Sequence, residues 1–174
     1  DAQVIPVIMY GSELWGYQRF DMLEKAHLYA CKRLLNVGPT TPNALVLGDT
    51  GRMPIFVLTA ARCVKYWLRV LTLQEDRLPR KVYNMMYHFQ EQGRKTWAFH
   101  IKELLCTNGF GVVWIQQGVG DVQAFLRLFR QRMIDQYKQN WHSDIQTSER
   151  FSVYSSFKTV FQRERYVQYE QKRC

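Results

Sequence analysis

The sequence lacks the residue groups with which most enzymes carry out their chemistry. No Asp-Asp pair occurs, and the seven aspartates stand singly along the chain. No Ser/His/Asp or Cys/His arrangement, HExxH motif or glycine-rich phosphate loop is present, and the G-x-G runs at 109–111 and 118–120 indicate turns because they follow no strand. Two-metal phosphoryl transfer needs paired carboxylates, so we expect no catalytic residue and no cofactor in this chain.

Cysteine is scarce and has no metal-binding pattern. The four cysteines, at 31, 63, 106 and 174, show no CxxC spacing, which fits reduced, buried thiols in an intracellular protein. His27 and Cys31 stand four residues apart in a helical pattern and could both face a metal, but no second ligand pair follows, and packing in the core is the alternative. Cys174 could be the first ligand of a zinc knuckle that continues beyond the sequence.

The chain also lacks an initiating methionine and a signal peptide, since it opens DAQVIPVIMYG without a basic leading segment. We interpret this start as a cut through a longer protein. No low-complexity segment and no repeat of fixed period is visible. With 47% apolar and 14% aromatic residues over 174 positions, the composition predicts a folded chain with a substantial core.

The positive charge is unevenly distributed. Residues 1–60 hold five Lys/Arg and five Asp/Glu, whereas residues 61–174 hold nineteen and ten, so the whole net charge of +9 lies in the second part. Such an asymmetry favours a polyanionic partner. The alternative is a surface that is basic only for solubility.

The most apolar stretch is 54–73, PIFVLTAARCVKYWLRVLTL. At 3.6 residues per turn its polar residues fall on one narrow stripe, and the rest of the circumference is apolar. The members of this stripe are Thr59, Arg62, Lys65, Arg69 and Thr72. Because such a helix must be wrapped by others, we expect it to be the central helix. The length would span a bilayer, but three positive charges on one face argue against a membrane.

The remaining patterns predict further helices. Residues 4–15 favour a helix over a short strand, and Asp21 with Glu24 resembles a capping box that opens a helix ending near Asn36. Thr41-Pro42 indicates the start of a short helix closed by Gly48. Further helices are predicted at 80–92, 96–105, 121–141 and from Ser152 or Ser155 onward, with 110–117 as an irregular link. The expected fold is an all-α, irregular multi-helix domain of about seven helices.

Basic residues form further stripes on the later helices. One stripe carries Arg127, Arg130 and Lys138, and another repeats every seven residues at Lys158, Arg165 and Lys172. Together with Arg62, Lys65 and Arg69, these side chains are candidates for phosphate contact, because each cation that neutralises a phosphate releases a counterion. Solvated helix faces would look the same. Trp114, in the predicted link, is the one tryptophan that we leave open for stacking on a base.

The first part of the sequence resembles a known family. The run PVIMYGSELWG, the helix LEKAHLYACKRLLNV and the segment TPNALVLGDTGRMPI are similar to the region directly downstream of the polymerase core in reverse transcriptases of non-LTR (LINE-type) retrotransposons of animals. Family members have P-x-x-x-Y-G-x-E-x-W, then K/R-x-L-L-G-V, then T-P-N and G-E-x-G-R-x-P. The matching positions here are Pro6, Tyr10, Gly11, Glu13, Trp15, Lys32, Leu34, Leu35, Val37, Thr41, Pro42, Asn43, Gly48, Gly51, Arg52 and Pro54.

The resemblance has limits. Asn36 stands where glycine is usual, and Asp49 where glutamate is usual. Asparagine is the next best residue after glycine for a helix end with positive φ. The specific agreement covers roughly the first 70 residues. The later agreement is limited to the spacing of a few residues.

The resemblance implies a thumb-like helical segment at 1–73, followed by a basic helical extension at 74–174. In such enzymes this region holds the template-primer duplex behind the active site, and the polymerase core ahead of Asp1 would supply the catalytic carboxylates with magnesium. The implied partners are RNA or an RNA–DNA hybrid and the polymerase core of the same polypeptide. The implied location is intracellular, in cytoplasm and nucleus, as a retroelement ribonucleoprotein.

Two other interpretations stay open at this point. The helices could pack on the polymerase core or another protein as a structural scaffold, with the charge incidental. The chain could also be a decayed element copy without function, since a degenerate reading frame keeps its patterns for a long time. Salt dependence of binding separates phosphate contact from apolar docking.

Overall fold

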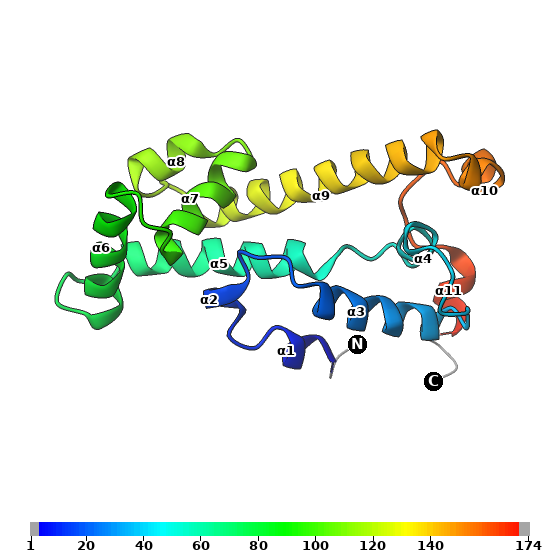
Figure 1. The fold of residues 1–174 in the computed structure, drawn as a ribbon, viewed down its shortest axis with the longest axis horizontal. Helices are drawn as coiled ribbons and strands as arrows, with labels where there is room; N and C mark the ends of the chain where they lie inside the picture. The colour runs from blue at the N-terminus through cyan, green and yellow to red at the C-terminus, as the bar shows by residue number, and fades with distance from the viewer. Residues whose placement is uncertain (1–3, 171–174) are drawn as a thin grey trace. The chain divides into compact units, whose positions relative to one another are not determined.

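The computed structural model describes residues 4–170. This part of the chain contains eleven α-helices, one 3-10 turn and no strand, which confirms the all-α class (Figure 1). More helices are present than the seven expected, because five of them are only four to six residues long. Helices this short hold too few residues for an amphipathic period to be visible.

The chain divides into two compact units, and each is built from two separate segments. The first unit comprises the residues up to Arg19 together with Phe56–Met133, and the second comprises Phe20–Ile55 together with the residues from Ile134 onward. This division differs from the boundary expected between 73 and 74, which falls inside the first unit. The segment that carries most of the family resemblance is therefore shared between both units.

The first unit packs its helices around aromatic side chains. Its elements are α1 (Val4–Ile8), α2 (Ser12–Trp15), α5 (Ile55–Leu71) after its first residue, α6 (Leu78–Glu91), α7 (Trp97–Thr107), α8 (Gly111–Gln116) and the first half of α9 (Val122–Thr147). Trp67 of α5 is fully buried and donates a hydrogen bond of 3.0 Å from Nε1 to the hydroxyl of Tyr83. Trp97 packs edge-on against Tyr83.

The helix expected at 54–73 is present as α5, with one change to its polar stripe. Arg62, Lys65 and Arg69 are exposed as predicted, but Thr59 is only 1% exposed and donates its hydroxyl proton to carbonyl oxygens of Gly16 or Phe56 at 3.2 Å. A buried hydroxyl needs such a partner. The central place of α5 in the whole chain stays a prediction.

Two predictions for the first unit were wrong in detail. Residues 4–15 form two short helices, because Gly11 between them has a φ of 65°. An irregular link was expected at 110–117, but the helix α8 forms there over Gly111–Gln116, and Trp114 within it is 5% exposed. Its ring stacks on that of Trp67 at a centroid distance of 5.8 Å. Trp114 therefore belongs to the core and is closed to a nucleic-acid base.

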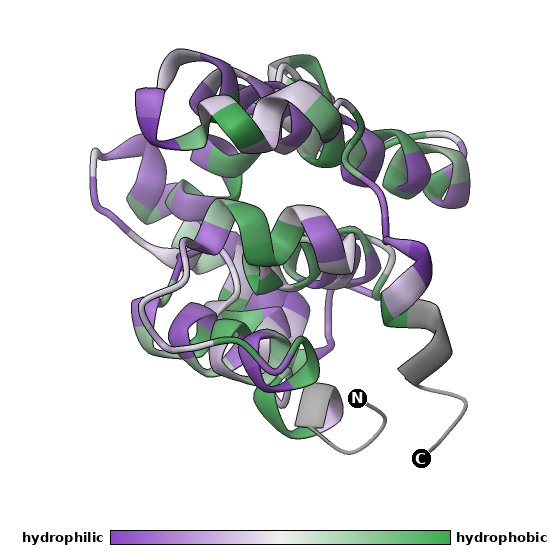
Figure 2. Cartoon of the chain, turned by 90° about the vertical axis from the view of Figure 1, so that its right-hand side faces the viewer, coloured by the Kyte–Doolittle hydropathy of each residue, from purple (hydrophilic) through white to green (hydrophobic). Residues whose placement is uncertain are grey.

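The second unit contains the other helices around a separate apolar core. Its elements are α3 (Asp21–Leu34), α4 (Asn43–Thr50), the second half of α9, the 3-10 turn η1 (Glu149–Phe151), α10 (Ser152–Phe157) and α11 (Arg165–Glu170). The buried core residues are Cys31, Val46, Leu47, Trp141, Ile145, Tyr154 and Phe161. Figure 2 shows apolar and polar residues alternating along the helices, as expected for amphipathic elements that each bury one face.

Several helix ends in the second unit differ from the predictions. No capping box forms: α3 has Phe20 at its N-cap, and the Glu24 carboxylate accepts a hydrogen bond of 3.2 Å from the backbone N–H of Ile55. The helix at 43–50 does not close at Gly48, which lies buried inside α4, but at Gly51 with a φ of 62°. Asn36, which stands after the end of α3 where glycine is usual in the family pattern, has a positive φ of 51°, a conformation that asparagine tolerates better than most residues.

The predicted long helix α9 is confirmed and extends further than expected. Asp121 caps it, since its Oδ1 accepts a hydrogen bond of 2.9 Å from the N–H of Ala124, and the helix continues past Trp141 to Thr147. The single last helix expected from Ser152 onward is instead two, α10 and α11, separated by non-helical residues 158–164. Lys172 and Cys174 lie outside the described residues.

The segment 48–52, GDTGR, lies against two other segments of the second unit, at Arg163 and at Cys31. A Cβ on Gly51 would meet the backbone nitrogen of Arg163 at 2.5 Å, so only glycine fits there. The side chain of Arg52 donates from Nη1 to Sγ of Cys31 at 3.8 Å. Residues from the strongest part of the family resemblance therefore have clear structural roles.

Within residues 4–170, no single α-helix has both the length and the apolar character needed to cross a membrane, although α4 and α5 meet the requirement when taken together.

Candidate nucleic-acid interface

Four of the nine predicted phosphate-contact residues line one groove in the first unit. Arg62 and Lys65 come from α5, and Arg127 and Arg130 come from the first half of α9. Each pair is spaced by three residues and so lies on one face of its helix. The groove has a volume of about 330 Å³, and its other lining residues are Met9, Leu58, Ala61, Gln123 and Leu126. We call it the α5/α9 groove.

The groove combines a cationic lining with apolar side chains and contains no carboxylate among its lining residues. Lys65, Arg127 and Arg130 are exposed, and none of them has a hydrogen bond or ion pair with any residue in the described range 4–170. Three unneutralised cations around one concavity create a positive potential that attracts an anion. The methylene stems and leucines can at the same time contact an apolar part of that ligand.

Arg62 differs from the other three because it is already held by the protein. Its Nη1 donates a hydrogen bond of 2.9 Å to the carbonyl oxygen of Met9, and Nη1 lies 4.0 Å from Oε1 of Glu13. The Arg62 side chain remains 44% exposed. Arg62 therefore holds the segment between α1 and α2 against α5 through these two contacts.

The other candidate residues of the first and second units do not join this groove. Arg69 lines a different concavity of about 520 Å³, beside Asp76 and Arg77. Lys138 is half-buried on the part of α9 that belongs to the second unit. The stripe expected along α9 is therefore divided between the two units.

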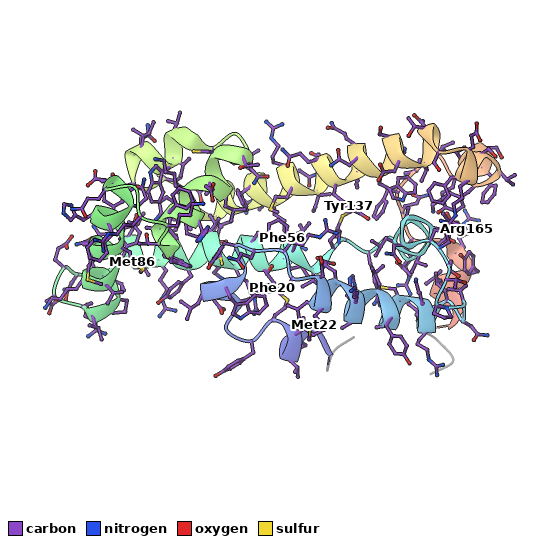
Figure 3. All side chains as sticks on the ribbon, in the orientation of Figure 1. Phe20, Met22, Phe56, Met86, Tyr137 and Arg165 are labelled. Carbon is purple, nitrogen blue, oxygen red and sulfur yellow. The ribbon has the colours of Figure 1, made fainter. Side chains whose placement is uncertain are left out.

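Lys158 and Arg165 do not form the predicted stripe, because they belong to different elements. Lys158 follows α10, is 4% exposed, and its Nζ donates to the carboxylate of Glu164 and, at 2.8 Å, to the carbonyl oxygen of Gln162. A buried ammonium that is paired in this way is closed to a phosphate. Arg165 is exposed at the start of α11, where Figure 3 labels its side chain.

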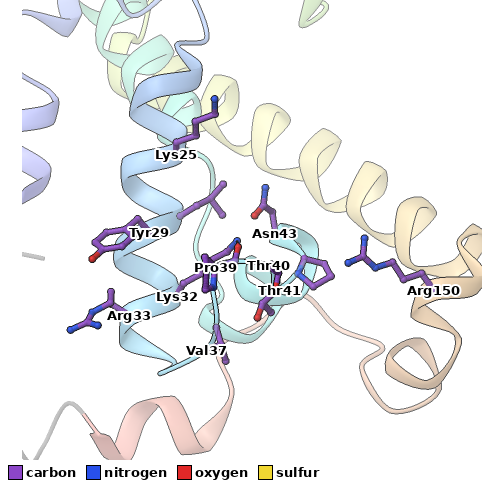
Figure 4. Close-up of a pocket in the computed structure, with 12 residues that line it drawn as sticks. Lys25, Tyr29, Lys32, Arg33, Val37, Pro39, Thr40, Thr41, Asn43 and Arg150 are labelled. Carbon is purple, nitrogen blue, oxygen red and sulfur yellow. The ribbon is translucent and has the colours of Figure 1, made fainter.

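A second basic concavity lies in the second unit, and no sequence pattern predicted it. It has a volume of about 770 Å³, and its lining contains four cations and no carboxylate. We call it the α3/α4 pocket (Figure 4), and its lining residues are Lys25, Leu28, Tyr29, Lys32, Arg33, Val37, Pro39, Thr40, Thr41, Pro42, Asn43 and Arg150. Residues 1–60 have a net charge of zero, so the distribution of charge along the sequence did not reveal this pocket.

The described residues 4–170 contain no cluster of three or more His, Cys, Asp or Glu side chains that could hold a metal. His27 and Cys31 are both buried, at 6% and 0% exposed. Burial lowers the pKa of the His27 imidazole and raises the pKa of the Cys31 thiol. Both shifts favour the neutral forms that pack in an apolar core.

Comparison with known proteins gives no match: no protein-family model, no curated protein and no solved structure matches this chain.

Proposed function

We propose that this chain is a non-catalytic, nucleic-acid-binding segment of a retrotransposon reverse transcriptase, an RNA-directed DNA polymerase. The observation that carries the proposal is the α5/α9 groove, in which Arg62, Lys65 and two arginines of α9 gather around one concavity without a carboxylate. The resemblance of residues 1–70 to the region downstream of the polymerase core supports the choice of parent protein. The polymerase core of the same polypeptide, with magnesium, would supply the chemistry.

The proposed mechanism is electrostatic. Cations on two helices contact successive phosphates of an RNA–DNA hybrid or of structured element RNA, and the bases are not read, because phosphate contacts position a nucleic acid without identifying its sequence. The apolar lining of the groove, including Leu58 and Leu126, would contact sugar edges between phosphates. Such a segment would act inside an intracellular ribonucleoprotein.

The test is a titration of the purified chain against a labelled RNA–DNA hybrid at three salt concentrations. Phosphate contact predicts that log K falls linearly with log salt, by roughly 0.9 for each phosphate neutralised on a duplex. Three free cations in the groove therefore predict a slope near −3, which should become shallower in a Lys65→Gln, Arg127→Gln, Arg130→Gln variant. A matched control removes three exposed cations elsewhere, at Arg19, Arg77 and Lys81. If the control variant weakens binding as much as the groove variant, the groove is not the site.

A structural scaffold remains the second candidate, and one observation favours it. Val7, Tyr10 and Leu14 on and beside α1 and α2 are 76%, 86% and 58% exposed. Neighbouring exposed apolar side chains suit docking on another protein surface, such as the polymerase core. Docking of this kind would be nearly indifferent to salt, so the same titration series, repeated with the polymerase core as partner, distinguishes the two functions.

A further inference from the structure

We infer that the α3/α4 pocket is a second nucleic-acid site, which takes a single-stranded segment rather than a duplex. The inference rests on the proposed function in one respect: it assumes the same class of ligand. The site itself is different, because it lies in the second unit and uses none of the residues of the α5/α9 groove.

The first step is the charge of the pocket. Lys25, Arg33 and Arg150 are exposed, and within residues 4–170 none of them has a hydrogen bond or ion pair with another residue. The fourth cation, Lys32, uses one of its three donors on the carbonyl oxygen of Pro39 at 2.7 Å, which positions its ammonium at the pocket. An uncompensated cluster of four cations at one concavity binds a multiply charged anion best.

The second step is the reason that the cations are uncompensated. Two carboxylates of residues 1–60 are used elsewhere: Glu24 accepts the N–H of Ile55, and Asp49 accepts the hydroxyls of Tyr154 and Tyr166. Residues 1–60, which are neutral in sum, therefore place Lys25, Lys32 and Arg33 at the pocket without a lining carboxylate, while Glu24 and Asp49 bind within the structure.

The third step is the kind of anion. Thr40, Thr41 and Asn43 add hydroxyl and amide groups to the lining, and Asn43 begins α4, whose N-terminal end carries a partial positive charge. Figure 4 shows Arg150 extending from its own element toward this part of the pocket. Cations together with hydroxyl and amide donors are the groups that bind phosphate oxygens.

The fourth step is the shape and the apolar part of the lining. A volume of about 770 Å³ suits a ligand of nucleotide size rather than a rigid duplex. Tyr29, 66% exposed, and Val37, Pro39 and Pro42 supply surfaces for an unpaired base and its sugar. A basic cavity with an exposed aromatic ring is how proteins hold single strands without sequence preference.

The experiment compares two ligands and two variants of the full 174-residue chain. The ligands are a short labelled oligouridylate, which has no stable secondary structure, and a blunt RNA–DNA hybrid. The pocket variant is Lys25→Gln, Arg33→Gln, Arg150→Gln, which spares Lys32 because of its bond to Pro39. The control, Arg19→Gln, Arg77→Gln, Lys81→Gln, removes the same charge outside the pocket. Circular dichroism checks that all variants are folded.

The expected result is a loss of oligouridylate affinity of at least about ten-fold in the pocket variant, with hybrid binding at the level of the control. A single Tyr29→Ala change should weaken oligouridylate binding by roughly five-fold or more, since stacking on an aromatic ring contributes that much per base. Equal oligouridylate binding by pocket and control variants would overturn the inference.

Two further outcomes separate the inference from the proposed function. If the wild-type chain binds the hybrid with a steep salt dependence and the pocket variant keeps oligouridylate binding, the pocket inference alone is wrong. If the wild-type chain binds neither ligand, the proposed function fails as well. A pocket variant that loses only its binding to phosphatidylserine vesicles would assign the pocket to a membrane surface and overturn the inference.

Discussion

The hydroxyl of Tyr154 donates a hydrogen bond of 2.7 Å to Oδ1 of Asp49, which lies 105 residues earlier in the chain. The other carboxylate oxygen, Oδ2, accepts the hydroxyl of Tyr166, also at 2.7 Å. A single carboxylate on α4 thus binds α10 and α11, and Asp49 is the residue that departs from the usual glutamate of the family pattern.

Changing Tyr154 to Phe should destabilise the second unit. The substitution keeps the ring, 8% exposed, and removes the only group that satisfies Oδ1 of Asp49 in the described part of the chain. A polar atom left without its partner costs about 1–3 kcal/mol. Tyr166→Phe is the matched control: Tyr166 is 53% exposed, so water can replace its hydroxyl and the loss should stay below about 1 kcal/mol. Urea unfolding measures both, and equal losses would contradict the prediction.

Changing Gly48 to Ala should also destabilise the second unit, although alanine is the better helix former. A Cβ at this position would lie 2.7 Å from Cζ2 of Trp141 and 2.7 Å from the hydroxyl oxygen of Tyr154. Overpacking of this kind costs about 1–3 kcal/mol, against a gain of about 0.5–1 kcal/mol from replacing a helical glycine. The net change is a loss of roughly 1 kcal/mol.

The control for Gly48 is Gly120→Ala, where an added Cβ meets no atom within 4 Å. Its free energy of unfolding should stay within about 0.5 kcal/mol of the wild type. A stabilising effect of Gly48→Ala in thermal or urea unfolding would show that the Trp141 ring can move aside.

These contacts also explain which parts of the fold the sequence could predict. The long helices α3, α5, α6, α7 and α9 were visible because each buries one face, and a buried face imposes a period on the sequence. Gly48 and Glu24 were misinterpreted because local rules were applied to residues whose partners are distant. Gly48 makes room for Trp141, and Glu24 binds the backbone of Ile55 rather than its own helix end.

The candidate site was predictable to a similar extent. Periodicity placed Arg62 with Lys65 and Arg127 with Arg130, each pair on one helix face, but only tertiary packing brings the two pairs to one groove. The α3/α4 pocket was missed since Arg150 is far in sequence from Lys25 and Lys32. Local charge counts cannot reveal a cluster that the fold assembles.

Stability should fall in alkaline solution, and Cys63 should be one cause. Burial raises the pKa of the Cys63 thiol from 9.0 to about 12, and the pKa of Tyr83 from 10.0 to about 12. Because both pKa values are higher in the folded state, the unfolded state loses its protons first. The stabilisation is complete below about pH 9 and is lost as the pH rises toward 12.

A Cys63→Ala variant tests this dependence. Its unfolding free energy at neutral pH should be lower, because Sγ of Cys63 packs in the core and lies 3.0 Å from the carbonyl oxygen of Ser12. Its decrease between about pH 9 and pH 11 should be shallower than in the wild type. Urea unfolding across that range measures the slope, and parallel slopes in the two proteins would exclude Cys63 as a contributor.

Arg62→Gln and Lys65→Gln should separate structural support from phosphate contact within the α5/α9 groove. Arg62 donates to the carbonyl oxygen of Met9 at 2.9 Å, so its loss should lower the unfolding free energy by about 1 kcal/mol. Lys65 is exposed and has no partner within residues 4–170. Its substitution should leave stability within about 0.5 kcal/mol of the wild type, while reducing the salt slope of hybrid binding by about one.

Arg19→Gln, an exposed change in the same unit and outside the groove, is the control for both variants. Unfolding and hybrid titration on one set of samples give the two quantities together. A Lys65→Gln protein that binds the hybrid like the Arg19→Gln control, with an unchanged salt slope, would remove the electrostatic mechanism. The exposed apolar residues of α1 and α2 would then be the better guide to function, because a scaffold needs no free cation in the groove.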